Sequence, residues 1–192
     1  MPDPLRIPTA PGWLTLAIER LWDGAHCRDS RQHGWIRLQS CAEGLDVEAS
    51  LPHQRMQRIP EAASGTRVAD LWEYDVVECF LVGAGGRYLE VELGAGGHFL
   101  VLTFAAPREL ADAHEDLAPE LCFQRDSEGW RSRVRIPSSV LPSELHALNA
   151  FAIVGGAHLA YQPLPGGSPD FHQPSRFPAA RLEGGLGSDE AP

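Results

Sequence analysis

The sequence contains no lysine, and all 16 of its basic residues are arginine. These stand against 26 acidic residues, which gives a formal net charge of −10. Phosphate binding needs a basic surface, so this charge argues against a nucleic-acid partner. Apolar runs are also short, and none approaches the ~20 residues that a membrane-spanning helix needs. Residues 1–12, with their prolines, fit neither a signal peptide nor a membrane anchor. We therefore expect a cytoplasmic protein that binds neither nucleic acid nor a membrane.

Cysteine is scarce as well. The 4 cysteines are far apart, with no CxxC pair and no Cys/His spacing of the zinc-finger type. We therefore expect reduced thiols and no zinc site, and the sequence identifies no cofactor. Cys79 lies inside an apolar run, where a buried free thiol is the expected state.

Glycine and proline are abundant instead, with 19 and 16 residues, and they favour short elements joined by turns. Apolar residues that alternate with polar ones, or short apolar runs, predict strands. The predicted strands are residues 14–18, 35–40, 45–50, 75–82, 87–93, 98–104, 129–136, 149–155 and 158–161. Glycine-rich turns at 83–86 and 94–97 join three of them into an antiparallel meander. One or two short helical turns are expected, at residues 109–120 and 138–147.

This pattern predicts an all-β fold. Eight or nine short strands without βαβ alternation indicate an antiparallel β-sandwich, jelly-roll-like. We expect a single domain over residues 13–183, an N-terminal extension over 1–12 and a disordered tail over 184–192. Residues 51–70 form a long polar link, which in a compact domain is often functional or mobile.

Three glutamates are informative, and the first of them, Glu78, lies on an apolar strand face. Glu78 shares a face with Phe80, and on the next strand Glu90 and Glu92 share a face with Tyr88. If the two strands pair, the glutamates lie within one patch. Such a patch can accept hydrogen bonds from sugar hydroxyls or bind a cation. Alternatively, arginines of neighbouring strands neutralise it; the candidates are Arg37, Arg131, Arg133 and Arg135.

Two aromatic residues, Trp72 and Tyr74, stand just before a predicted strand, at the end of the long polar link. A loop aromatic in this position can expose its face, and sugar C–H groups stack on such faces while polar groups bind the hydroxyls. For Trp72, a core position is the alternative.

Histidines supply further candidates. His98 opens a predicted strand, His158 follows a glycine pair, and Asp170 and His172 are two residues apart in a late loop. In an extended loop these last two side chains point the same way, which would allow a metal site together with His98 or His158. No compact spacing such as HExxH supports that alternative.

The central block carries a resemblance to a known family. Residues 71–80 (LWEYDVVECF), 88–93 (YLEVEL) and 97–102 (GHFLVL) resemble uncharacterised proteins similar to family-nine carbohydrate-binding modules, within the DOMON-like β-sandwiches. The resemblance implies a jelly-roll-like sandwich with a sugar-binding face. It also implies that Trp72 and Glu78 match the tryptophan and the strand pattern with which such modules hold a sugar. No tryptophan follows Trp130 to match their second one.

The sequence therefore favours a non-catalytic module that binds a small polar ligand, for example a saccharide, by aromatic stacking and carboxylate hydrogen bonds. The predicted ligand-binding residues are Trp72, Tyr74, Glu78, Glu90, Glu92, His98, His158, Asp170 and His172. Neither a catalytic residue nor a metal ligand is assigned. Two alternatives stay open: a metal- or carboxylate-dependent enzyme acting on a small polar substrate, and a β-sandwich that binds a protein partner.

Overall fold

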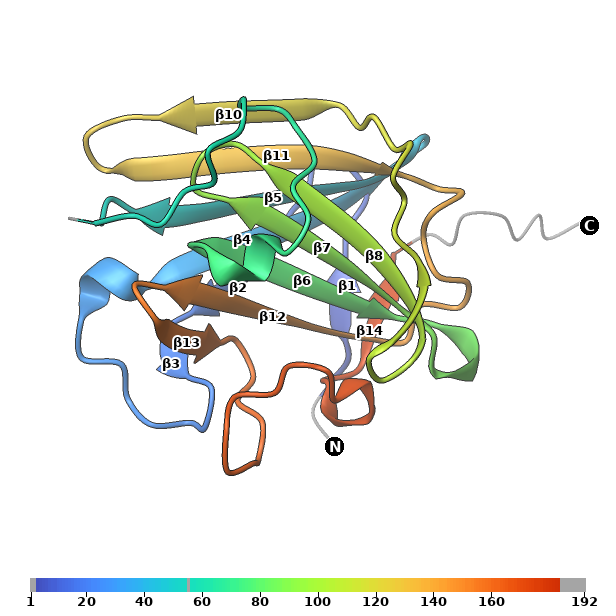
Figure 1. Ribbon diagram of the computed structural model, residues 1–192. Helices are drawn as coiled ribbons and strands as arrows, with labels where there is room; N and C mark the ends of the chain where they lie inside the picture. The colour runs from blue at the N-terminus through green and yellow to red at the C-terminus, as the bar shows by residue number, and fades with distance from the viewer. Residues whose placement is uncertain (1–2, 55, 184–192) are drawn as a thin grey trace, which may run out of the picture.

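The fold is described by a computed structural model, which covers residues 3–54 and 56–183 (Figure 1). The strands of this part are β1 (Leu5–Ile7), β2 (Leu14–Ile18), β3 (Arg20–Leu21), β4 (Gly34–Cys41), β5 (Gly44–Pro52), β6 (Val76–Val82), β7 (Tyr88–Gly94), β8 (Phe99–Ala106), β9 (Glu109–Asp112), β10 (Leu121–Arg125), β11 (Gly129–Pro137), β12 (Ala147–Val154), β13 (Ala157–Ala160) and β14 (Ala180–Leu182). The short 3₁₀ helices are η1 (Ser30–Gln32), η2 (Leu71–Glu73), η3 (Ala84–Gly86) and η4 (Pro174–Arg176). No helix in these residues is long and apolar enough to cross a membrane.

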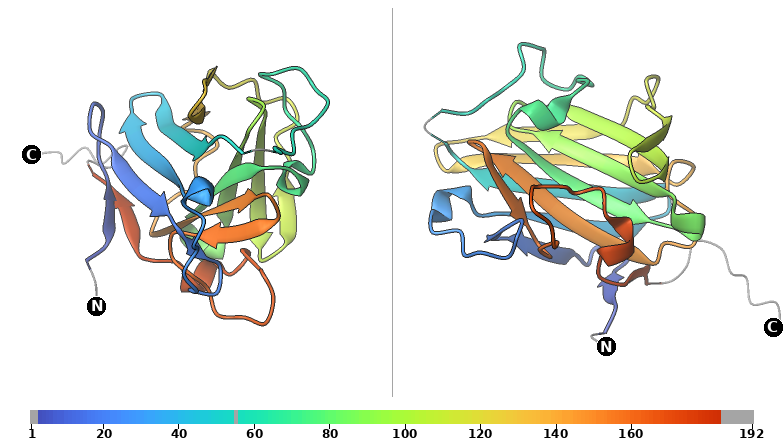
Figure 2. Two further views of the ribbon diagram at one scale, coloured as in Figure 1. Left: turned by 90° about the vertical axis from the view of Figure 1, so that its left-hand side faces the viewer. Right: turned by 60° about the horizontal axis from the view of Figure 1, so that its bottom comes forward.

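Two antiparallel sheets lie face to face, as Figure 2 shows from two further sides. One sheet has 5 strands in the order β10-β11-β5-β4-β2, and the other has 7 in the order β3-β13-β12-β6-β7-β8-β9. The predicted meander is confirmed, because β7 pairs with β6 on one side and with β8 on the other. The molecule is therefore the antiparallel, jelly-roll-like β-sandwich that the sequence predicts.

The main hydrophobic core fills the space between the two sheets, and a second apolar cluster covers the outer face of the seven-stranded sheet. In that second cluster Phe80 and Phe151 from the sheet meet Leu164, Phe171 and Phe177 from the late loop. Every residue of β6, β7 and β12 is consequently buried. Burial on both faces explains why these strands read as nearly continuous apolar runs.

Each strand predicted from the sequence coincides with an observed one. Five short strands were not predicted: the edge strands β3, β9 and β10, and the separate pair β1 and β14. Short helical turns are present, as the sequence predicts, but they are η1, η2, η3 and η4 and do not fall at residues 109–120 or 138–147. Residues 109–112 form β9, an exposed strand that pairs with the edge of β8. In the second segment, the amides of Val140 and Leu141 donate to the carbonyls of Pro137 and Ser138, which makes turns but no helix. An exposed edge strand such as β9 needs no apolar alternation, so its acidic sequence resembles that of a surface helix.

The segment 3–12, which we expected to extend from the domain, lies against it. Within this segment β1 pairs in parallel with β14, and Ile7 is buried in the main core. This pairing brings the two ends of the described chain side by side (Figure 1). The predicted tail, 184–192, lies outside the described residues.

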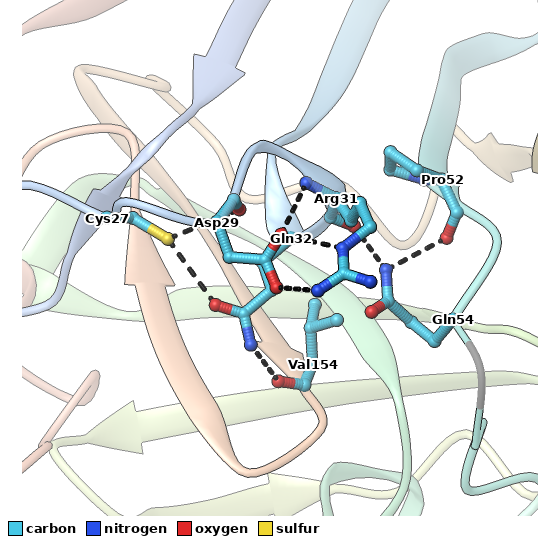
Figure 3. A network of polar contacts seen from close by, with 7 residues as sticks. All are labelled: Cys27, Asp29, Arg31, Gln32, Pro52, Gln54 and Val154. Atoms are coloured by element: carbon cyan, nitrogen blue, oxygen red, sulfur yellow. Dashed lines mark hydrogen bonds and ion pairs between the residues drawn. The ribbon is translucent and has the colours of Figure 1, made fainter.

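A small polar network attaches the connection before β4 to both sheets (Figure 3). The Cys27 thiol donates to Gln32 Oε1 over 3.4 Å, and Gln32 Nε2 donates to the carbonyl of Val154 at the end of β12 over 3.4 Å. Gln54, just after β5, donates to the carbonyl of Arg31.

All four cysteines are free, and burial raises the pKa of the expected buried thiol, Cys79, to about 12.

Candidate functional site

A pocket of about 430 Å³ opens on the outer face of the seven-stranded sheet. Its floor comes from strands β6, β7, β8 and β12, and its walls come from η2, the β8–β9 hairpin, β13 and the late loop. The volume lies in the range of pockets that hold small molecules. Of the predicted site residues, those that line the pocket are Trp72, Glu78, Glu90, His158, Asp170 and His172.

The glutamates come together because β6 and β7 pair in antiparallel register. Glu78 lies directly opposite Glu92, and Glu90 lies opposite Phe80. The exposed fractions are 2% for Glu78, 3% for Glu90 and 0% for Glu92, so all three carboxyl groups are withdrawn from water. Glu78 and Glu90 face the pocket, whereas Glu92 is sealed beside them.

Arginines do not neutralise this patch, so the alternative drawn from the sequence is wrong. Arg37 and Arg131 pair with Glu48, and Arg135 pairs with Asp46, all on the five-stranded sheet. In the part of the chain that the structure describes, none of the three patch glutamates forms an ion pair, and both carboxyl oxygens of Glu92 lack a hydrogen-bond partner.

Burial without partners keeps these carboxyl groups protonated. Desolvation raises the pKa of Glu78 to about 8. It also raises the pKa of Glu90 and that of Glu92 well above their ordinary values, and repulsion between neighbouring glutamates adds to both shifts. Arg108 offsets the rise in the pKa of Glu90 only in part. Near neutral pH the pocket floor therefore presents carboxylic acids, which both donate and accept hydrogen bonds.

The walls of the pocket are aromatic. Trp72, from η2, is 42% exposed, which removes the alternative that it is a core residue. Phe171 stacks on Phe151 with ring centroids 4.1 Å apart, and its ring lies 5.9 Å from that of His158. Flat apolar faces thus stand beside the polar floor, an arrangement that suits a ligand with one apolar and one polar side.

Hydrogen bonds hold the late loop against the β8–β9 hairpin. Asp170 Oδ1 accepts from Arg108 Nη2 over 2.8 Å and from the amide of His172 over 3.1 Å. The Tyr88 hydroxyl accepts from the amide of Arg108 over 3.1 Å and lies 2.7 Å from His172 Nδ1. Burial is the main reason that the pKa of His172 falls to about 4, so its ring is neutral. A neutral Nδ1 can accept the tyrosine proton, which orients the ring.

Three predicted site residues do not line the pocket. Glu92 lies beside it, as described above, and Tyr74 is half-buried against the outer apolar cluster. His98 is buried elsewhere, and its Nε2 bonds to the carbonyl of Ala62 over 3.0 Å, so it supports the long link. Among the described residues, no three His, Cys, Asp or Glu side chains are grouped so as to hold a metal ion. The metal site considered from His98, His158, Asp170 and His172 does not assemble.

The sequence reasoning missed the contribution of the β8–β9 hairpin. Arg108 and Leu110 both line the pocket, and Arg108 takes a φ of 62° in the two-residue turn between the strands. The available signal was the Pro107-Arg108 pair directly after an apolar strand. The prediction of a helix over 109–120 concealed the hairpin.

The chain matches no protein-family model. It is similar to the UPF0462 protein C4orf33 homolog of Rattus norvegicus, with 32% identity over 175 residues that cover 85% of this chain and 86% of the relative. The human UPF0462 protein C4orf33 is 30% identical over 170 residues, with 83% of each chain covered. Among solved structures, a proposed carbohydrate-binding protein from Bacteroides uniformis superposes with a TM-score of 0.69. That likeness covers 94% of this chain and 97% of the other at 14% sequence identity, so it supports the fold alone.

The rat and human relatives match over most of their own length as well as over most of this chain. At this identity and coverage, the chain belongs to the UPF0462 family.

Proposed function

We propose that this protein is a non-catalytic binding module, and that the pocket on its seven-stranded sheet holds a small polar ligand of the saccharide class. The observation that carries the proposal is the combination of an exposed Trp72 with the buried carboxyl groups of Glu78 and Glu90, which form no ion pair with any described residue. Carboxyl groups in a water-excluded floor can bind hydroxyls, while the aromatic face stacks on sugar C–H groups. His158, Asp170 and His172 would complete the polar contacts.

Two further points support this reading. The chain shares its fold with a proposed carbohydrate-binding protein, and the residues 71–80 resemble those of carbohydrate-binding modules. A carboxylic acid that is still protonated near neutral pH can also donate a hydrogen bond to a sugar oxygen, which an ionised carboxylate cannot do. The pocket floor would therefore both donate hydrogen bonds to the hydroxyl groups of a sugar and accept hydrogen bonds from them.

The test is calorimetric titration of the protein with mono- and oligosaccharides, first selected by a rise in the thermal midpoint. For a saccharide that binds, Trp72→Ala should weaken binding by about 1–3 kcal/mol, because a packed aromatic contact is lost. The thermal midpoint of the free protein should change little, since Trp72 is 42% exposed.

The matched control is Trp13→Ala. Trp13 lies next to β2 of the opposite sheet, where the Arg37 guanidinium lies 4.3 Å from its ring. This variant should leave saccharide binding unchanged. If no saccharide binds, or if both tryptophan variants lose binding equally, the pocket is not a saccharide site of the proposed kind.

A further inference from the structure

The acidic side chains that line the pocket outnumber its cationic side chains. Arg108 and Asp170 form an ion pair with each other over 2.8 Å. The pKa of His158 and that of His172 are both lowered, mainly by burial, so both rings stay neutral. Among the described residues, Glu78 and Glu90 then remain on the floor without a cationic partner. Behind them lies Glu92, with Asp70 as a further source of negative potential at its carboxyl group.

An ammonium group is the chemical complement of these two carboxyl groups. A buried carboxylate is stable only when it is paired and hydrogen-bonded, and an ammonium group supplies both a charge and three N–H donors. The chain has no lysine, so no side chain of this protein can supply an ammonium group. The two arginines whose charges act on groups of the pocket are held in ion pairs: Arg108 by Asp170, and Arg58 by Asp75.

We propose that the ligand of this pocket carries an ammonium group, which binds between Glu78 and Glu90 while the rest of the ligand lies against Trp72. The inference rests on the proposed function and narrows the ligand to a small hydroxylated amine, of which an amino sugar is the saccharide form. The aromatic walls fit this class, because aromatic faces attract cations as well as C–H groups. A divalent metal ion is the less suitable occupant, since no three ligand side chains of the described residues are grouped to hold one.

Binding of a cation should release a proton. In the free protein, burial raises the pKa of Glu78 to about 8, so its carboxyl group holds a proton at neutral pH. An ammonium group pairs with the ionised form and displaces that proton. Affinity should therefore rise by up to tenfold for each pH unit as the pH increases towards about 8, and then level off. A neutral polyol would bind the protonated form, release no proton and show no such rise.

The experiment compares matched pairs of probes by calorimetric titration. The first pair is 5-aminopentan-1-ol and pentane-1,5-diol, which differ in charge but little in shape, at about pH 6 and about pH 8. The second is glucosamine and glucose, at about pH 6.5, where the amine is protonated. Titration in two buffers of different ionisation enthalpy counts the protons released. We expect the amine of each pair to bind about tenfold or more tightly than its partner, with proton release.

Glu78→Gln should abolish both the pH dependence and the proton release, and it should weaken amine binding by about tenfold or more. Glu90→Gln should act in the same direction, which keeps the test decisive if one variant folds poorly. Glu73→Gln is the matched control, because Glu73 is exposed in η2, next to Trp72. It should leave amine binding and proton release unchanged.

Four outcomes would overturn the inference. Equal binding of amine and alcohol without proton release would show a pocket for neutral ligands, and the proposed function would stand if saccharide binding still needed Trp72. Calcium binding that displaces protons, with no amine binding, would show a metal site instead. If no amine binds while a neutral saccharide does, only the inference of an ammonium group is rejected. If no probe binds, the proposed function is rejected as well.

Discussion

At the scale of single residues, the protein treats its buried carboxyl groups in two ways. Burial alone would raise the pKa of Asp46, but hydrogen bonds from Arg135 and Gln39 outweigh burial and hold that pKa below its ordinary value. On the seven-stranded sheet no such donor among the described residues meets Glu78, and burial raises its pKa to about 8. The difference between a structural carboxylate and a candidate binding group therefore lies in the partners and not in the burial.

The unpartnered glutamates should make stability fall as pH rises. A carboxyl group whose folded pKa is raised stabilises the fold fully below its unfolded pKa, about 4.5, and this contribution is lost as pH rises towards about 8. Each such group changes the free energy of unfolding by up to about 1.4 kcal/mol per pH unit within that window. Glu92→Gln should remove one of these contributions, so its free energy of unfolding, measured by urea denaturation, should depend less steeply on pH than that of the parent protein.

The control for this prediction is Glu43→Gln, which removes a carboxyl group from the connection between β4 and β5 at an exposed position. Its pH dependence should match that of the parent protein. A Glu92→Gln curve parallel to the parent curve from about pH 5 to about pH 8 would mean that Glu92 is not held protonated by the fold.

At the scale of elements, the late loop between β13 and β14 decides what the seven-stranded sheet can do. Phe171 and Phe177 cover the outer apolar cluster, and Asp170 attaches the loop to the β8–β9 hairpin through Arg108. Without this cover the sheet would expose a broad apolar face. The solvated face of an antiparallel sheet is normally polar. The same segment that completes the second cluster also builds the wall of the pocket.

Phe171→Ala should loosen this loop. Phe171 is only 8% exposed, and the centroid of its ring lies 4.1 Å from that of Phe151, on which it stacks. Its loss should lower the free energy of unfolding by about 3 kcal/mol, because a buried aromatic leaves a cavity. Amide hydrogen exchange over residues 161–178 should become faster than in Trp72→Ala, which truncates an exposed aromatic of the opposite wall. Unchanged exchange over 161–178 would mean that other contacts hold the loop.

At the scale of the whole molecule, the two ends of the described chain close the sandwich together. β1 pairs in parallel with β14 through Leu5, Arg6 and Ile7, and Ile7 has no exposed surface. Residues at the start and at the end of the chain thus contribute to one core. We propose that the domain begins at about residue 5, earlier than the boundary at residue 13 that the sequence suggested.

Ile7→Ala tests this boundary. Truncation of a fully buried isoleucine should lower the free energy of unfolding by about 2–5 kcal/mol, as it does in other cores. Arg6→Ala, on the same strand but exposed, should change it by less than about 0.5 kcal/mol. Denaturant titration of both variants measures the two values. Equal stability of the two variants would make residues 1–12 an extension after all.

Much of the fold and part of the site can be predicted from the sequence. Alternation locates β4, β5 and β11, and the glycine turns pair β6, β7 and β8 correctly. The pairing of β6 with β7 is also enough to bring Glu78, Glu90 and Glu92 together. Arg108 was not predicted, because β9 is an exposed edge strand without apolar alternation and only the Pro107-Arg108 pair marks the turn. His98 was misplaced because the start of a strand does not reveal which neighbours will surround it.

The sequence alone predicts nine of the strands, their glycine turns and the common face of the three glutamates, and it shows the acidic charge without lysine. These properties depend on neighbours within a few residues, since side chains alternate with a period of two along a strand. Tertiary packing determines that both faces of the seven-stranded sheet are buried, that no arginine of the described residues forms an ion pair with the three glutamates, and that Trp72 stays exposed at the rim. These depend on contacts between segments far apart in the chain, such as Phe151 with Phe171 and Arg108 with Asp170, which no local pattern encodes.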